Sequence, residues 1–71
     1  MTNATQYKLN DTAYDLFHAP SSDIGLVRDI ADATAAALYS QTGTPTSTSI
    51  IINAETGETV ETLDYNNGVR V

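Results

Sequence analysis

The chain has 71 residues and contains no cysteine, which excludes disulfides and any cysteine-bound zinc or iron–sulfur site. This length fits one domain, residues 1–71, with a thin hydrophobic core. Nine acidic residues against three basic ones give a net charge of −6, which opposes binding to nucleic acid.

The N-terminal segment alternates weakly between apolar and polar residues. Tyr7 and Leu9 fall on one face of an extended chain, and Tyr14 and Leu16 continue the same period after Asn10–Thr12. This pattern predicts a strand or a loose hairpin, and one long strand with an irregular middle fits almost as well.

A helix over about residues 22–41 is the element with the strongest signal. Pro20 disfavours helix at the residue before it, and Ser21 or Ser22 can cap the first free N–H groups. Gly43 is well placed to stop the helix.

The expected apolar face of this helix recurs at spacings of three and four residues, and Asp29 and Asp32 fall on the opposite side. Its members are Ile24, Val27, Ile30, Ala31, Thr34 and Leu38. A run of alanines, Ala33 and Ala35–Ala37, allows a neighbouring element to approach the helix closely.

The C-terminal half has the pattern of strands and turns. Ile50–Ile52 predicts a strand that is buried on both faces or presented to another molecule. Asn53–Gly57 is expected to turn, with Gly57 left-handed, into a second strand over Glu58–Tyr65. Asn67-Gly68 predicts a two-residue hairpin turn before a short edge strand at Val69–Val71, whose apolar residues we expect to pack.

These elements predict an α+β fold in which one amphipathic helix packs on a small antiparallel sheet, in the order β(β)αβββ. One helix covers one face of such a sheet, and the apolar residues exceed what it can cover. We therefore expect a homodimer or higher oligomer, with Tyr14, Tyr39 and Ile51 at the interface.

The chemistry-bearing residues do not form a catalytic, cofactor-binding or metal-binding pattern. His18 is the only histidine, and Asp29 with Asp32 is a common arrangement on an exposed helix face. Neither a signal sequence nor an apolar run of about 20 residues is present, so we expect a cytoplasmic protein without membrane contact. We do not expect an enzyme.

Four of the nine acids lie within ten residues of the C-terminal half, at Glu55, Glu58, Glu61 and Asp64. We expect this acidic hairpin, with Tyr65 or Leu63 as a buried anchor, to contact a protein partner with a basic surface. The expected function is a non-enzymatic protein-interaction module, such as a small phage or mobile-element inhibitor of a basic host protein. The alternatives are an accessory subunit that is stable only in an assembly and a small-molecule-binding module with its ligand between protomers.

Overall fold

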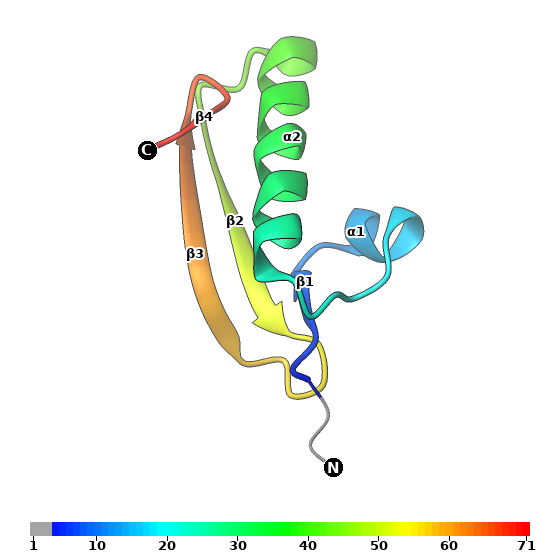
Figure 1. The fold of residues 1–71 in the computed structure, drawn as a ribbon. Coiled ribbons are helices and arrows are strands. Elements are labelled where there is room, and N and C mark those ends of the chain that lie inside the picture. Colours follow the sequence, from blue (N-terminus) through cyan, green and yellow to red (C-terminus); the bar gives the residue numbers. More distant parts are fainter. Residues whose placement is uncertain (1–3) are drawn as a thin grey trace.

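A computed structural model describes residues 4–71 (Figure 1). The elements in chain order are β1 (Tyr7–Leu9), α1 (Thr12–Phe17), α2 (Ile24–Thr42), β2 (Thr46–Asn53), β3 (Thr59–Asn66) and β4 (Val69–Arg70). The strands form one antiparallel sheet in the order β1-β2-β3-β4, and α2 packs against it. The predicted α+β fold with one main helix on an antiparallel sheet is confirmed.

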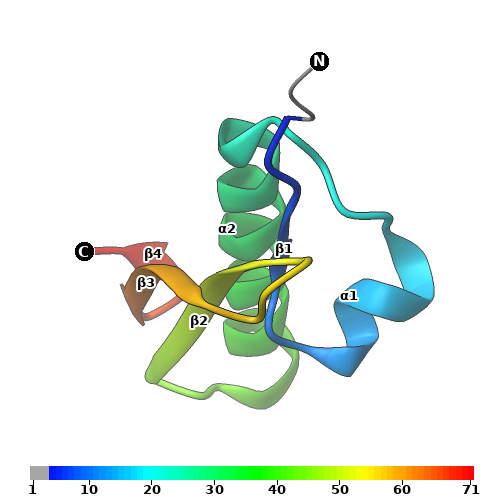
Figure 2. The ribbon, with the colours of Figure 1, turned by 90° about the horizontal axis from the view of Figure 1, so that it is seen from below.

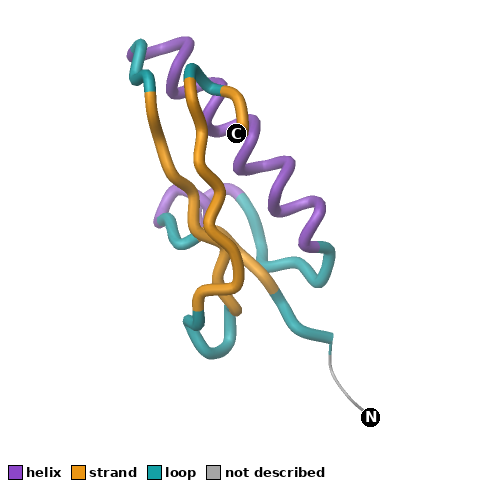
Figure 3. The backbone as a smooth tube through the Cα atoms, turned by 90° about the vertical axis from the view of Figure 1, so that its left-hand side faces the viewer, coloured by secondary structure: helices purple, strands orange, loops and turns teal. Residues whose placement is uncertain are grey.

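The centre of the sheet is the hairpin of β2 and β3, which forms a long twisted ribbon beside α2 (Figure 3). These strands pair from Thr46 opposite Asn66 to Ile52 opposite Thr59, with a bulge between Ile51 and Ile52. β1 pairs only with the end of β2, and β4 only with the end of β3. Much of β3 is therefore an edge of the sheet.

Tyr7–Leu9 forms a strand as predicted, but residues 12–17 are helical, which corrects the predicted continuation of the strand or hairpin through Tyr14 and Leu16. Asp11 caps α1, because its carboxylate accepts a hydrogen bond from the Ala13 N–H at 2.9 Å. Tyr14 is buried and Leu16 is exposed, since residues two apart point to nearly opposite sides of a helix. The alternation seen in the sequence is therefore not that of a strand.

The N-terminus of α2 is capped by Asp23, whose carboxylate accepts from the Leu26 N–H at 3.2 Å. The prediction that Ser21 or Ser22 is the cap is wrong. The Ser21 hydroxyl instead accepts from the Asp23 N–H at 3.0 Å, so it supports the capping residue.

The remaining turns form as predicted. Gly43 ends α2 in the left-handed conformation with φ 69°, and Gly57 adopts φ 76° in the turn before β3. Asn67 and Gly68 both have positive φ, as a two-residue hairpin of the type I′ kind requires. The strand after this turn is short, and Val69 is exposed instead of packed.

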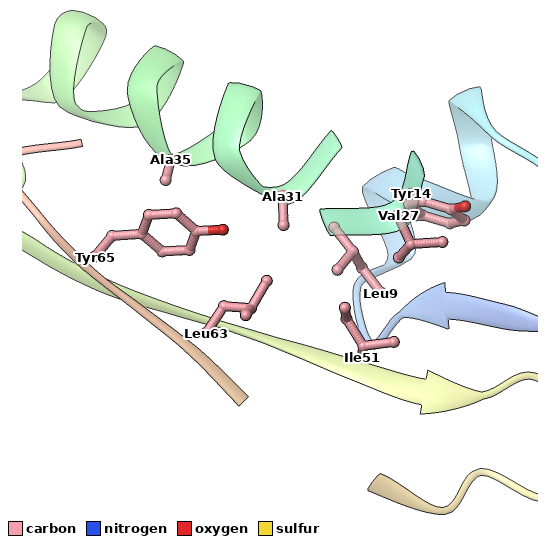
Figure 4. Close-up of a cluster of buried hydrophobic side chains, with 8 residues drawn as sticks. All are labelled: Leu9, Tyr14, Val27, Ala31, Ala35, Ile51, Leu63 and Tyr65. Carbon is pink, nitrogen blue, oxygen red and sulfur yellow. The ribbon is translucent and has the colours of Figure 1, made fainter. Parts of the chain in front are cut away.

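The core lies between α2 and one face of the sheet (Figure 4). Its buried side chains are Leu9, Tyr14, Val27, Ala31, Ala35, Ile51, Leu63 and Tyr65. Val27 and Ala31 were predicted on this face, whereas Thr34 and Leu38 of the predicted face are exposed. The small alanines let the large Tyr65 ring fit beneath the helix.

The other face of the β2–β3 ribbon is not covered by α2. Figure 2 shows α2 on one side of the curled sheet, with α1 beyond β1. Ile51 points toward α2 and is fully buried, while its neighbours Ile50 and Ile52 are half-buried. Among residues 4–71, neither helix has the length and apolar character that crossing a membrane requires.

Candidate functional site

An apolar groove of about 340 Å³ lies between α1 and α2. The α1 wall is formed by Ala13, Tyr14 and Phe17, and the α2 wall by Ile30, Thr34, Ala37, Leu38 and Gln41. Asp11 and His18, which flank α1, add polar groups to the lining. Figure 1 shows α1 standing away from α2 and from the rest of the sheet.

Phe17, which lines this groove, and Leu16, which precedes it in α1, are each 78% exposed, although both are large and apolar. Exposed large side chains gathered next to an apolar groove are typical of an interaction surface. This surface was not predicted from the sequence. The signal that could have found it is the spacing of Ile30, Thr34 and Leu38, which were placed in the core instead of in a second stripe on α2.

Contacts of Tyr14 hold α1 in this position. Its ring is buried, and its hydroxyl donates a hydrogen bond to the Ala19 carbonyl at 3.0 Å. Burial raises the pKa of the Tyr14 phenol above its usual 10.0; the Lys8 charge lowers it and the Asp15 charge raises it. An ion pair between Lys8 of β1 and Asp15 of α1 ties the two elements together.

The four acids of the predicted C-terminal contact do not share one surface. Glu61 lies on the face of β3 toward α2, where it accepts from the Arg28 Nε at 2.8 Å. Asp64 lies on the opposite face and accepts from the Thr48 hydroxyl at 3.0 Å. Glu55 and Glu58 are exposed in the preceding turn. Of these four acids, Glu55, Glu58 and Asp64 have no basic partner among residues 4–71.

Tyr65 and Leu63, the two expected anchors for a partner, are buried in the protein's own core. The Tyr65 hydroxyl donates to Asp32 Oδ1 at 2.7 Å, and Arg70 lies 3.5 Å from the other oxygen of that carboxylate. Burial raises the pKa of Tyr65 well above 10.0, the hydrogen bond to Asp32 and its charge raise it further, and Arg70 opposes them. In this conformation the ring cannot reach a partner.

The three expected oligomer-interface residues have different positions. Tyr14 and Ile51 lie in the core with 3% and 0% of their surface exposed, so neither side chain is free to contact a second copy in this fold. Tyr39, near the end of α2, is 40% exposed. Part of its surface is covered by the turn at Gly68.

All three basic side chains are engaged in ion pairs within the chain, Lys8 with Asp15, Arg28 with Glu61 and Arg70 with Asp32. The other six acids of residues 4–71 have no basic side chain within ion-pair distance. They are Asp11, Asp23, Asp29, Glu55, Glu58 and Asp64. The surface therefore offers carboxylates and lacks an unpaired lysine or arginine.

Metal-ligating side chains are dispersed: within residues 4–71, His, Asp and Glu do not gather in groups of three or more that could hold a metal ion. The Asp32 carboxylate is engaged by Tyr65 and Arg70. His18 stacks at a tilt on Tyr14, with ring centroids 5.1 Å apart.

In comparisons with known proteins, no protein-family model matches the sequence, and no curated protein or solved structure is significantly similar to it.

Proposed function

We propose that the chain is a non-enzymatic protein-interaction module that binds a protein with a basic surface. The observation that carries this proposal is the apolar groove between α1 and α2, which the exposed Phe17 lines, on a surface where residues 4–71 leave carboxylates, but no lysine or arginine, without an ion-pair partner. Apolar contacts of this kind supply affinity, and surface charge raises the association rate.

The acids of the β2–β3 hairpin also contribute to binding in this proposal, but in a different way from the one expected from the sequence. Glu55, Glu58 and Asp64 have no basic partner within the described part of the chain, so they attract a basic protein over distances of about 8 Å at physiological salt. They do not supply a buried anchor, because Tyr65 and Leu63 are in the core. The groove takes over that role.

An accessory subunit of a larger assembly is the second candidate function, and the exposure of Leu16 and Phe17 favours it. The two candidates differ in the state of the isolated chain. A regulator or inhibitor folds alone, whereas an obligate subunit requires its neighbours. Sedimentation and thermal unfolding of the isolated chain at several concentrations separate them, and a dilution-dependent melting temperature indicates self-association.

Capture from a lysate of the source organism tests the proposal. We expect the immobilised chain to retain a protein of basic isoelectric point, with faster association at low salt than at high salt. Replacing Glu55, Glu58 and Asp64 together by Gln, Gln and Asn should slow that association several-fold at low salt and much less at high salt.

An unrelated folded protein of similar size and net charge is the control for non-specific attraction. Retention of the same proteins by this control, or association rates that ignore both salt and the triple substitution, contradicts the proposed function. A retained small apolar molecule instead of a protein supports the small-molecule alternative.

A further inference from the structure

The geometry points to one kind of occupant for the groove: an amphipathic α-helix of a basic partner protein, packed along an outer stripe of α2. This inference rests on the proposed function and specifies its contact. We define the outer stripe as Ile30, Thr34, Ala37, Leu38 and Gln41.

The outer stripe has the spacing of a helix-packing surface. Its members recur at three and four residues and lie beside Ala31 and Ala35, which face the sheet; Val27, buried one turn before Ile30 and Ala31, belongs to the N-terminal end of the same side of the helix. Thr34 and Ala37 are small and sit between larger residues, so a second helix can approach closely there. From Ile30 to Gln41 the stripe spans about 16 Å, or three helical turns.

The protein's own α1 is too short to fill this surface. Its six residues span about 9 Å, which covers little more than half of the stripe. Phe17 and Ala13 of α1 form one wall of the groove, and Leu38 remains exposed on the other. The site therefore has the form of a three-helix packing that lacks its third helix.

Charge selects the partner. Asp11 lies in the groove lining, and Asp15 beside it is balanced by Lys8. Because all three basic side chains are engaged in ion pairs, a second copy of this chain would bring more carboxylates without an unpaired lysine or arginine to meet them. Lysine or arginine on the flanks of an apolar helix face complements this surface, and a helix with acidic flanks is repelled.

Synthetic peptides test this inference without the natural partner. The probe is a peptide of about 18 residues, or 27 Å of helix, with leucine and alanine on one face and lysine on the other. Two matched peptides serve as controls: a scrambled sequence of the same composition, and a version with glutamate in place of lysine. Fluorescence anisotropy measures affinity, and amide NMR spectra of the full chain locate the contact.

We expect the basic amphipathic peptide to bind at least about tenfold more tightly than either control peptide, which corresponds to about 1.4 kcal/mol. The largest amide shifts should fall in residues 13–18 and 30–41. No binding of the amphipathic peptide, equal binding of the scrambled one, or shifts centred on β3 overturns the inference.

A matched pair of variants on α2 separates groove contacts from general charge. Ala37 lines the groove, whereas Ala33 is exposed and does not line it. Ala37→Gln adds bulk without charge and should weaken peptide binding about tenfold, while Ala33→Gln should change it less than about twofold. Equal effects of the two substitutions contradict the inference.

The same pair distinguishes this inference from the proposed function. If capture of a basic protein from the lysate is salt-dependent but insensitive to Ala37→Gln, the proposed function stands and the helix-binding groove is wrong. If capture and peptide binding both respond to Ala37→Gln, and neither responds to Ala33→Gln, both are supported.

Discussion

Tyr65 joins the hydrophobic core to the surface ion pairs of the protein. Its ring lies beneath Ala31 and Ala35, and its hydroxyl donates to Asp32, which also pairs with Arg70 (Figure 4). Ionisation of the Tyr65 phenol would place a second negative charge beside the Asp32 carboxylate. The folded protein therefore favours the neutral form of the phenol. This arrangement couples protonation of Tyr65 to folding.

The free energy of unfolding should fall with rising pH above about 10, because the unfolded phenol loses its proton there while the folded one keeps it. Tyr65 contributes up to about 1.4 kcal/mol per pH unit to this fall, and below pH 10 its protonation adds no pH dependence. Denaturant unfolding at pH values from about 8 to about 11, in steps of about one unit, measures this decrease in the free energy of unfolding.

Tyr65→Phe should cost about 1–2 kcal/mol at neutral pH through the lost hydrogen bond to Asp32, and should reduce the alkaline slope. The pKa of Tyr14 is also raised, so Tyr14→Phe is the matched control for a second buried phenol. An alkaline slope that is the same in Tyr65→Phe and wild type contradicts this coupling.

Which single residues could be predicted from the sequence depends on the range of the interaction. Gly43, Gly57 and Asn67-Gly68 obey local rules of backbone conformation, so their turns were predictable. The partners Asp32 and Tyr65 are 33 residues apart, and local patterns do not reveal such a pair. The placement of Glu61 and Asp64 on opposite faces could have been predicted, since residues three apart in a strand face opposite sides.

At the scale of elements, the turn at Gly68 fits closely against the C-terminal half of α2. A Cβ atom at Gly68 would lie 3.0 Å from Tyr39 Cβ and 3.2 Å from Ala36 Cα. This turn and the Tyr65 ring both pack against the alanine run of α2, which was predicted to allow close approach. The packing between β4 and α2 depends on the absence of a side chain at one position.

Gly68→Ala should destabilise the protein by about 2–4 kcal/mol, combining a strained left-handed backbone with a steric clash against α2. Gly57→Ala is the matched control, because its φ of 76° is similar but no atom lies within 4 Å of the added Cβ. It should cost only the backbone part, about 1–2 kcal/mol. Equal unfolding free energies for the two variants would argue against close packing of the turn on α2.

The helical conformation of α1 could not be predicted from its pattern of apolar residues. Six residues give too few apolar positions to separate a helical period from a strand period, and capping by Asp11 was the only local signal. Burial of Tyr14 by the rest of the fold decides the conformation. The groove was missed for the same reason, since its α1 wall was expected to be a strand.

Asp11→Ala should loosen α1 by about 1 kcal/mol through loss of its N-cap, without unfolding α2. Hydrogen exchange of the amides in residues 14–18 should become several-fold faster. Asp11→Asn preserves the cap and removes the charge, so it should leave this exchange nearly unchanged. Equal acceleration in both variants would assign the effect to charge instead of capping.

At the scale of the whole molecule, the distribution of charge is as informative as its sum. Each of the three basic side chains is held by a carboxylate of another element, so the ion pairs bridge β1 to α1, α2 to β3 and β4 to α2. Partly exposed pairs at the surface contribute only about 0–1 kcal/mol each. Their main consequence is that, within residues 4–71, the side chains left without an ion-pair partner include carboxylates but no lysine or arginine.

Random duplex DNA or RNA should therefore show no measurable binding at physiological salt, because Lys8, Arg28 and Arg70 cannot release counterions without breaking their pairs. Fluorescence anisotropy with a labelled duplex measures this. Glu61→Gln removes the ion-pair partner of Arg28. This variant should still not bind the duplex, because the net charge of the protein remains negative. Affinity at the micromolar level or tighter would disprove the argument.

The connection between β1 and β2 affects the order in which the chain folds. Tyr7 pairs with Asn53, which closes a loop of about 45 residues, whereas β2 and β3 are joined by a short turn. The hairpin can form early, and docking of the N-terminal strand comes late. Leu9→Ala should then mainly speed unfolding, while a substitution in the Asn53 turn should mainly slow folding, as stopped-flow kinetics would measure. The reverse assignment would show that the N-terminal strand belongs to the folding nucleus.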